Sequence, residues 1–97
     1  MKGGWVYILA SKRNGTLYTG VTADLPARMM QHRQRQGRGF AARYGCAMLV
    51  HAENYERIDE AIAREKAIKK WRRAWKLQLI ERGNPDWTDL FEHIIGA

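Results

Sequence analysis

Apolar and polar residues alternate over short runs in the first half of the chain, a pattern typical of strands. Two runs rich in β-branched and aromatic residues, Trp5 to Ala10 and Thr16 to Thr22, flank Lys12-Arg13-Asn14-Gly15. Asn-Gly is a favoured tight-turn dipeptide, so the pattern predicts a β-hairpin. A third run, Ala47 to Glu53, predicts another strand bounded by Asn54. Three strands are enough for one small sheet.

The segment between the second and third runs has the signals of a short helix. Asp24 can cap a helix that starts at Leu25 and runs to about Gln36, with Pro26 tolerated in the first turn. Gly37 is expected to end it.

Helical spacing returns from Tyr55 onward, where an apolar stripe is formed by Ile58, Ala61, Ile62 and Ile68. We expect a bend near Trp71 and a second helical piece from Trp71 to Arg82, which Gly83-Asn84-Pro85 ends. A short amphipathic helix is expected over Trp87 to Ile95. These elements predict one small α/β domain over residues 1–97.

The composition shows an excess of basic over acidic residues. The chain has 97 residues, and its 17 Lys and Arg against 10 Asp and Glu give a net charge of +7 and a pI near 10.0. Such a balance favours polyanionic partners, nucleic acid first. Cys46 is the single cysteine, which excludes an intrachain disulfide, argues against a structural zinc site and favours a reducing cytoplasm. The run Trp5 to Ala10 is too short to span a membrane.

The positive charge is concentrated in two blocks. No Asp or Glu occurs between Leu25 and Ala52, where the basic residues are Arg28, Arg33, Arg35, Arg38 and Arg43. The second block holds Arg64, Lys66, Lys69, Lys70, Arg72, Arg73 and Lys76 against the single acid Glu65. The two blocks could flank one groove for nucleic acid, or they could form a solvated face. Trp71 and Trp75 could stack on bases, although their spacing favours packing in the core.

Four positions have the chemistry of a reactive site. Arg28 and His32 are four residues apart, hence on one helix face, where a guanidinium fork and an imidazole can meet one anion. Tyr7 and Tyr18 lie on the two strands of the hairpin, so pairing could bring their hydroxyls to one face. The alternatives are surface residues for the first pair and packing for the second.

Glu65 is informative because a helical wheel places it on the apolar stripe, between Ala61 and Ile62. An inward carboxylate costs desolvation energy unless it is paired or bound to a metal. Lys69, four residues later, offers a salt bridge. The wheel alone leaves the metal and the salt bridge open.

Taken together these residues resemble a family. Trp5-Val6-Tyr7 followed by Tyr18-Thr19-Gly20 resembles the paired signature of GIY-YIG endonucleases, with Trp5 in place of the first glycine. The order of that family's small single-domain members continues in Thr22 to Arg28 with His32, in Ala63-Arg64-Glu65 with Lys69-Lys70-Trp71, and in Asn84-Pro85-Asp86-Trp87. The resemblance covers residues 5 to about 90.

The resemblance implies an α/β (α+β) fold with a three-stranded antiparallel sheet flanked by helices. It also implies hydrolysis of phosphodiester bonds in DNA with one divalent ion, Mg²⁺ or Mn²⁺. In this family's pattern Glu65 is the lone protein ligand of the metal, and Arg28 neutralises charge on the scissile phosphate. Tyr7 helps to activate or position the attacking water, with Tyr18 beside it. Because a free tyrosine titrates near 10, we expect a metal-acidified water that Tyr7 orients.

The remaining assignments are less central. His32 would shuttle a proton or contact phosphate, and Asn84 would support the site from the C-terminal segment. Contacts to nucleic acid are expected from Arg33, Arg35, Arg38, Arg43, Lys69, Lys70, Arg72, Arg73 and Lys76. The substrate would be branched or nicked DNA, cut structure-selectively or with low sequence specificity in repair or recombination, alone or with a partner protein. The alternative is a non-catalytic nucleic-acid-binding module that uses the same basic groove.

Overall fold

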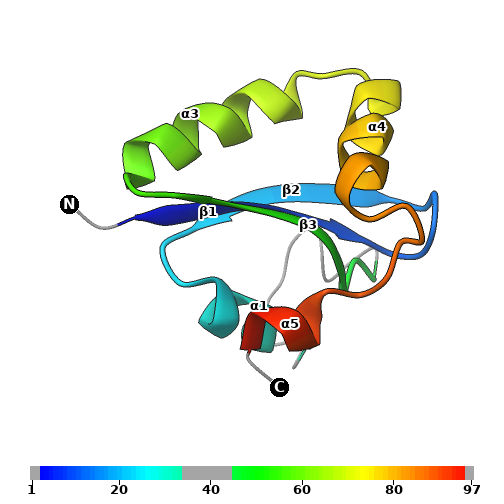
Figure 1. Ribbon diagram of the computed structural model, residues 1–97, viewed down its shortest axis with the longest axis horizontal. Helices are drawn as coiled ribbons and strands as arrows, with labels where there is room; N and C mark the ends of the chain where they lie inside the picture. Colours follow the sequence, from blue (N-terminus) through cyan, green and yellow to red (C-terminus); the bar gives the residue numbers. More distant parts are fainter. Residues whose placement is uncertain (1–2, 34–44, 96–97) are drawn as a thin grey trace.

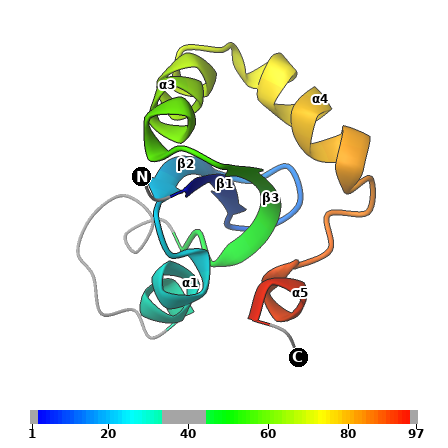
Figure 2. The same cartoon turned by 60° about the vertical axis from the view of Figure 1, so that its left-hand side comes forward.

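A three-stranded sheet lies between two layers of helices in the computed structural model, which describes residues 3–33 and 45–95 (Figure 1). The elements in chain order are β1 (Gly4–Ala10), β2 (Leu17–Thr22), α1 (Leu25–Arg33), β3 (Met48–Tyr55), α3 (Ile58–Lys69), α4 (Arg73–Gly83) and α5 (Phe91–Ile95). Helices α3 and α4 lie on one side of the sheet, and α1 and α5 lie on the other (Figures 1 and 2). The predicted α+β class is confirmed.

The strand order is β2-β1-β3, and both outer strands run antiparallel to β1. The predicted hairpin is confirmed, with Asn14 at a φ of 58° in its turn, a conformation that asparagine tolerates better than most residues. The third strand runs two residues beyond the predicted end at Glu53. The reason is that Trp5 and Gly4 of β1 still pair with Asn54 and Tyr55.

Burial of β1 on both faces creates two hydrophobic cores. Toward α3 and α4, the core is formed by Val6, Ile8, Ala10, Val50, Ala61, Ile68, Ile80 and Trp87. Toward α1 and α5, it is formed by Tyr7, Leu9, Leu25, Met29, Cys46 and Leu49. Each large apolar side chain removed from water contributes roughly 1.5–3 kcal/mol. Alternation along β1 therefore decides into which of the two cores each side chain packs.

Helix α1 begins as predicted, because Asp24 Oδ1 accepts a hydrogen bond from the Ala27 N–H at 3.1 Å. Its expected end at Gly37 lies outside the described residues. In α3 the buried residues are Ala61, Glu65 and Ile68, so Glu65 does lie on the inner stripe. Ile62 does not, being 38% exposed.

The second half differs from the prediction at two boundaries. Trp71 lies in the break between α3 and α4, and α4 begins only at Arg73. The last helix is shorter than expected, covering Phe91–Ile95, because Trp87 takes a φ of 56° and is buried, which is incompatible with starting a helix there. Gly83-Asn84-Pro85 ends α4 as predicted.

A carboxylate on β3 ties the edge of the sheet to α3. Glu53 Oε1 accepts hydrogen bonds from Tyr55 Oη at 2.8 Å and from Arg64 Nε at 3.0 Å. Its Oε2 lies 2.8 Å from His51 Nε2 and accepts a second bond from Arg64 at 3.2 Å. Burial alone would raise the pKa of Glu53, but the bonds from His51, Arg64 and Tyr55 outweigh burial and lower the pKa to about 2.

This carboxylate makes stability depend on pH. Because the folded-state pKa of Glu53 is below its ordinary value of 4.5, its contribution is present above that pH and is lost as the pH falls toward 2. The contribution is on the order of 3 kcal/mol. We expect the free energy of unfolding of the wild type, measured in urea, to fall steeply as the pH decreases over this range. Glu53→Gln should be less stable at neutral pH, and its stability should depend less on pH. Glu56→Gln, which removes an exposed acid nearby, is the control; parallel profiles for wild type and Glu53→Gln would contradict the assignment.

Candidate active site

Three aromatic rings gather on the α1 side of the sheet. Leu9 is paired with Tyr18, and Tyr7 lies two residues before Leu9, so both tyrosines point to the same face. Their ring centroids are 6.3 Å apart. From α1, the His32 ring stands edge-on to both, 6.1 Å from Tyr7 and 6.1 Å from Tyr18. The hairpin and α1 thus bring together three of the predicted site residues.

Arg28 completes this group, which we call the α1-face cluster: Tyr7, Tyr18, Arg28 and His32. It lies one turn before His32 on α1 and is half-buried. Its positive charge reaches both neighbours, since it opposes the rise in the pKa of Tyr7 and adds to the fall in the pKa of His32. The cluster therefore pairs one fixed cation with three rings that carry polar atoms.

Two polar atoms of the cluster are buried without a hydrogen-bond partner among the described residues. They are the Tyr7 hydroxyl, on a side chain with no exposed surface, and His32 Nε2. Buried polar groups are nearly always paired, because an unpaired group loses its hydrogen bonds to water. Two such atoms in one cluster are typical of a site that supplies hydrogen bonds to a ligand or to water.

The protonation states follow from burial. Burial, reinforced by the Tyr18 hydroxyl and opposed by Arg28, raises the pKa of Tyr7 to about 12. Burial and then the charge of Arg28 lower the pKa of His32. At neutral pH Tyr7 is consequently a protonated phenol that can donate a hydrogen bond, and His32 is a neutral imidazole that can accept a proton.

Gly20 lies against the Tyr7 ring, a contact that the sequence motif did not explain. It pairs with Tyr7 across the hairpin, and a Cβ at position 20 would lie 2.5 Å from both Cζ and Oη of Tyr7. Only glycine lets the phenol ring cross β2 so closely. The available signal was a glycine inside an otherwise β-forming run, which often marks close approach of another group.

Glu65 lies on α3, on the side of the sheet opposite the α1-face cluster. Helix α3 packs on β1 and β2, on the face of the sheet opposite α1 (Figure 1). The Glu65 side chain is 11% exposed, and its Oε2 lies 2.7 Å from Lys69 Nζ. The salt bridge, one of the two alternatives for this carboxylate, is therefore present. To act with Tyr7 and Arg28, Glu65 has to reach past β2, the edge strand that carries Tyr18, so their convergence stays a prediction.

The donor set can be tested against a divalent ion. Within residues 3–33 and 45–95, no three His, Cys, Asp or Glu side chains gather into a metal cage. Mg²⁺ does not require one, because it keeps several waters and binds through one or two carboxylates together with substrate phosphates. Glu65 fits this requirement, and the ammonium of Lys69 lies beside its carboxylate.

Asn84 has a structural role in this fold. It is buried, and its Nδ2 donates to the carbonyl oxygens of Val50 at 3.2 Å and Thr88 at 2.8 Å. Its Oδ1 accepts from the Thr88 N–H at 3.0 Å. The side chain joins the end of α4 to β3, so its expected part in the chemistry remains a prediction.

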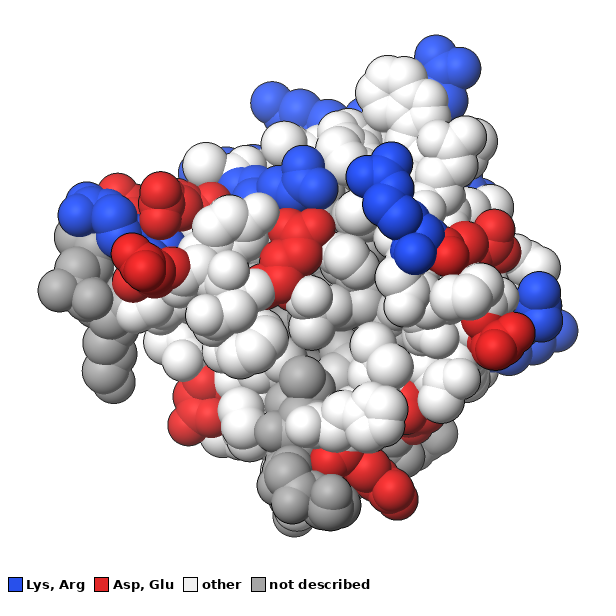
Figure 3. Space-filling model, in the orientation of Figure 1, with Lys and Arg blue, Asp and Glu red and all other residues white. Residues whose placement is uncertain are grey.

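The basic residues divide into several groups. Lys and Arg side chains are scattered over the upper part of the face in Figure 3, and Asp or Glu side chains lie beside several of them. Lys69 pairs with Glu65, while Arg73 donates to the carbonyl oxygens of Asn14 at 2.7 Å and Gly15 at 2.6 Å, which ties α4 to the hairpin turn. Arg72 stacks on Trp75; Lys70 is exposed, and Lys76 is half-buried. Arg35, Arg38, Arg43 and the side chain of Arg33 lie outside the described part of the chain.

Comparison with known proteins gives this geometry a context. Residues 3–78 match the family model of the GIY-YIG catalytic domain. A UPF0213 protein from Staphylococcus aureus (strain Mu3) is 38% identical over 81 residues, which cover 84% of this chain and 98% of the relative. Another UPF0213 protein, from Staphylococcus saprophyticus, is 35% identical over 79 residues, which cover 81% of this chain and 95% of the relative.

A solved structure has a similar fold over most of the chain. The solution NMR structure of a UPF0213 protein from Bacillus halodurans matches with a TM-score of 0.57 and 27% identity, over 93% of this chain and 95% of that one. Among the described residues, no helix has the length and apolar character needed to cross a membrane. With the family model covering most of the chain and the paired tyrosines meeting on one face, the chain belongs to the GIY-YIG family, a family of nucleases.

Proposed function

We propose that the protein is a divalent-metal-dependent endonuclease that hydrolyses phosphodiester bonds in DNA at the α1-face cluster. The observation that carries this proposal is the pair of buried, unpartnered polar atoms of Tyr7 and His32 beside the Arg28 guanidinium. Cation, donor and acceptor are the three groups that hydrolysis of a phosphate ester needs. Membership of a nuclease family supports the same conclusion.

Each side chain has a distinct role in this reaction. Arg28 pairs with the scissile phosphate and stays charged as negative charge builds up on it. Tyr7 donates a hydrogen bond that orients the attacking water, since its raised pKa keeps the phenol protonated at neutral pH. His32 Nε2 accepts the proton of that water as its oxygen bonds to phosphorus, and the leaving oxygen takes a proton from solvent.

Glu65 would hold the ion, Mg²⁺ or Mn²⁺, which when bound polarises phosphate oxygens and acidifies water. The substrate would be branched or nicked DNA, cut with little sequence specificity, as in repair or recombination. If the purified protein binds DNA but leaves it uncut with either ion, the non-catalytic module replaces this proposal.

The Tyr7 hydroxyl can be tested by Tyr7→Phe. We expect cleavage of nicked or branched DNA to fall by about 10²-fold, because the water loses its orienting donor. Stability should stay equal or rise, because the lost hydroxyl has no partner in the described part of the fold. Tyr55→Phe is the matched control: it removes the bond to Glu53, so it should lower the melting temperature and keep cleavage. Full activity in Tyr7→Phe would refute the role of the phenol.

The close approach at Gly20 predicts a second effect. Gly20→Ala places a methyl group against the Tyr7 ring and should displace the hydroxyl, reducing cleavage at least as much as Tyr7→Phe does. Gly83→Ala is the control, because beyond its chain neighbours and the backbone of its own helix no described atom lies within 4 Å of the position its Cβ would take. Initial rates and thermal melts of both variants provide the comparison. Wild-type rates in Gly20→Ala would show that the ring position does not matter.

The two interpretations of Glu65 make opposite predictions. If it holds the metal, Glu65→Gln loses cleavage while DNA binding in chelator and the melting temperature change little. If its role is the ion pair, Lys69→Gln and Glu65→Gln lower stability together and both keep cleavage. Gel-based cleavage with Mg²⁺ or Mn²⁺, run beside thermal melts, distinguishes the two. Retained cleavage in a folded Glu65→Gln protein would end the metal assignment.

A further inference from the structure

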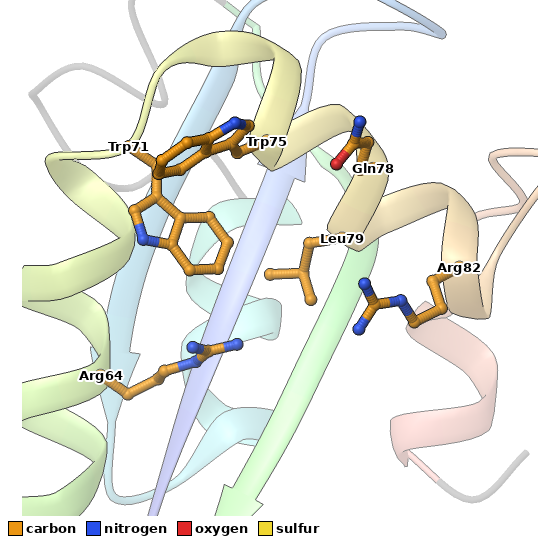
Figure 4. Close-up of a pocket in the computed structure, with 6 residues that line it drawn as sticks. All are labelled: Arg64, Trp71, Trp75, Gln78, Leu79 and Arg82. Atoms are coloured by element: carbon orange, nitrogen blue, oxygen red, sulfur yellow. The ribbon is translucent and has the colours of Figure 1, made fainter.

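A pocket of about 320 Å³ opens between α3 and α4, across the sheet from the α1-face cluster (Figure 4). Its lining consists of Arg64, Trp71, Trp75, Gln78, Leu79 and Arg82. The four residues from α4 follow the spacing i, i+3, i+4 and i+7, so they form a single face of that helix. Its volume lies at the lower end of the usual range for small-ligand sites, roughly 300–1,000 Å³, and fits one aromatic ring system.

Two indole rings form one wall. Trp71 and Trp75 meet edge to face with centroids 6.1 Å apart. The expectation that both pack in the core holds for Trp71, which packs against the α3–α4 core, and is wrong for Trp75, which is 48% exposed. Leaving so large an apolar side chain in water gives up burial energy. Arg72 lies over one face of the Trp75 ring, with its Cζ 5.1 Å from the centroid, so a ligand would stack on the remaining exposed surface of this indole.

The opposite wall is cationic. Arg64 is held by its two bonds to Glu53, with its Cζ 5.0 Å from the Trp71 ring centroid. The guanidinium of Arg82 points from α4 across Leu79 toward the same space (Figure 4). No acidic side chain is among the lining residues, while Gln78 adds an amide that can both donate and accept. Because Arg64 is paired with Glu53, Arg82 supplies the positive charge for a ligand, and the pocket is suited to a planar ligand that carries an anionic group.

We propose that this pocket binds an unpaired nucleotide of a nucleic-acid chain, with its base stacked on Trp75 and its phosphate at Arg82. Bases present a π-face to aromatic side chains only when they are not stacked within a duplex. The basic residues around α3 and α4 would hold the phosphates on either side. The inference rests on nucleic acid as the polymer in the proposed function, and it does not depend on cleavage. It makes a single-stranded segment part of the preferred substrate.

The test is binding in the presence of chelator. Fluorescence anisotropy would follow a labelled oligothymidine of about eight nucleotides and a blunt duplex of equal length. Trp75→Ala should weaken single-strand binding by about five- to a hundredfold and leave duplex binding within about twofold. Trp75→Phe, which keeps a ring, should restore most of the affinity. Arg82→Gln should weaken binding of the single strand more than Arg57→Gln, which removes an exposed arginine outside the pocket.

Two control variants show whether the loss of binding is specific to the pocket. Ile62→Ala removes an exposed apolar side chain of α3 that does not line the pocket, and it should bind as the wild type does. Arg57→Gln should also bind single strands as the wild type does, and because binding is measured in chelator it does not depend on cleavage, so failure of the nuclease proposal and failure of this one are distinguishable. Equal loss on both DNA forms, unchanged binding in a folded Trp75→Ala protein, or a dimer in sedimentation that depends on Trp75 would overturn the inference.

Discussion

Burial of β1 on both of its faces is the constraint on which the structure depends. Every residue from Val6 to Ala10 is fully buried, and alternate side chains belong to different cores. The phenol of Tyr7 consequently lies against α1, while its neighbours Val6 and Ile8 close the core beneath α3. A slip of one residue in the pairing would exchange the two sets and remove the hydroxyl from Arg28 and His32. The register of the sheet therefore determines which side chains form the site.

Burial also decides the chemistry that each group can perform. A phenol beside an arginine could be expected to ionise readily, yet desolvation is the larger effect and raises the pKa of Tyr7 to about 12. The same desolvation lowers the pKa of His32, which leaves an imidazole able to accept a proton. The division between a hydrogen-bond donor and a proton acceptor thus arises from the dry environment on the α1 side.

The two faces of the sheet carry different surfaces, and a separate set of hydrogen bonds braces each of them. Glu53 fixes Arg64 against Trp71 and joins β3 to α3, so the wall of the α3–α4 pocket is held by the edge of the sheet. Arg73 fixes the start of α4 to the hairpin turn, whose strands carry Tyr7 and Tyr18. Sites placed on elements braced in this way keep their geometry better than sites on loops. Both proposed surfaces therefore rest on rigid parts of the fold.

Sequence by itself determined the features that depend on neighbours a few residues apart. Asn14-Gly15 predicted the turn, Asp24 the start of α1, Gly83-Asn84-Pro85 the end of α4, and the wheel placed Glu65 on the inner stripe. The spaced motifs were enough to indicate the family. Only the tertiary structure decided that Trp75 is exposed and Asn84 is engaged with β3, that Gly20 makes room for the Tyr7 ring, and that Glu65 starts from the opposite side of the sheet to α1. Exposure, desolvation and close approach depend on which element packs across the sheet, and local periodicity carries no information about that partner.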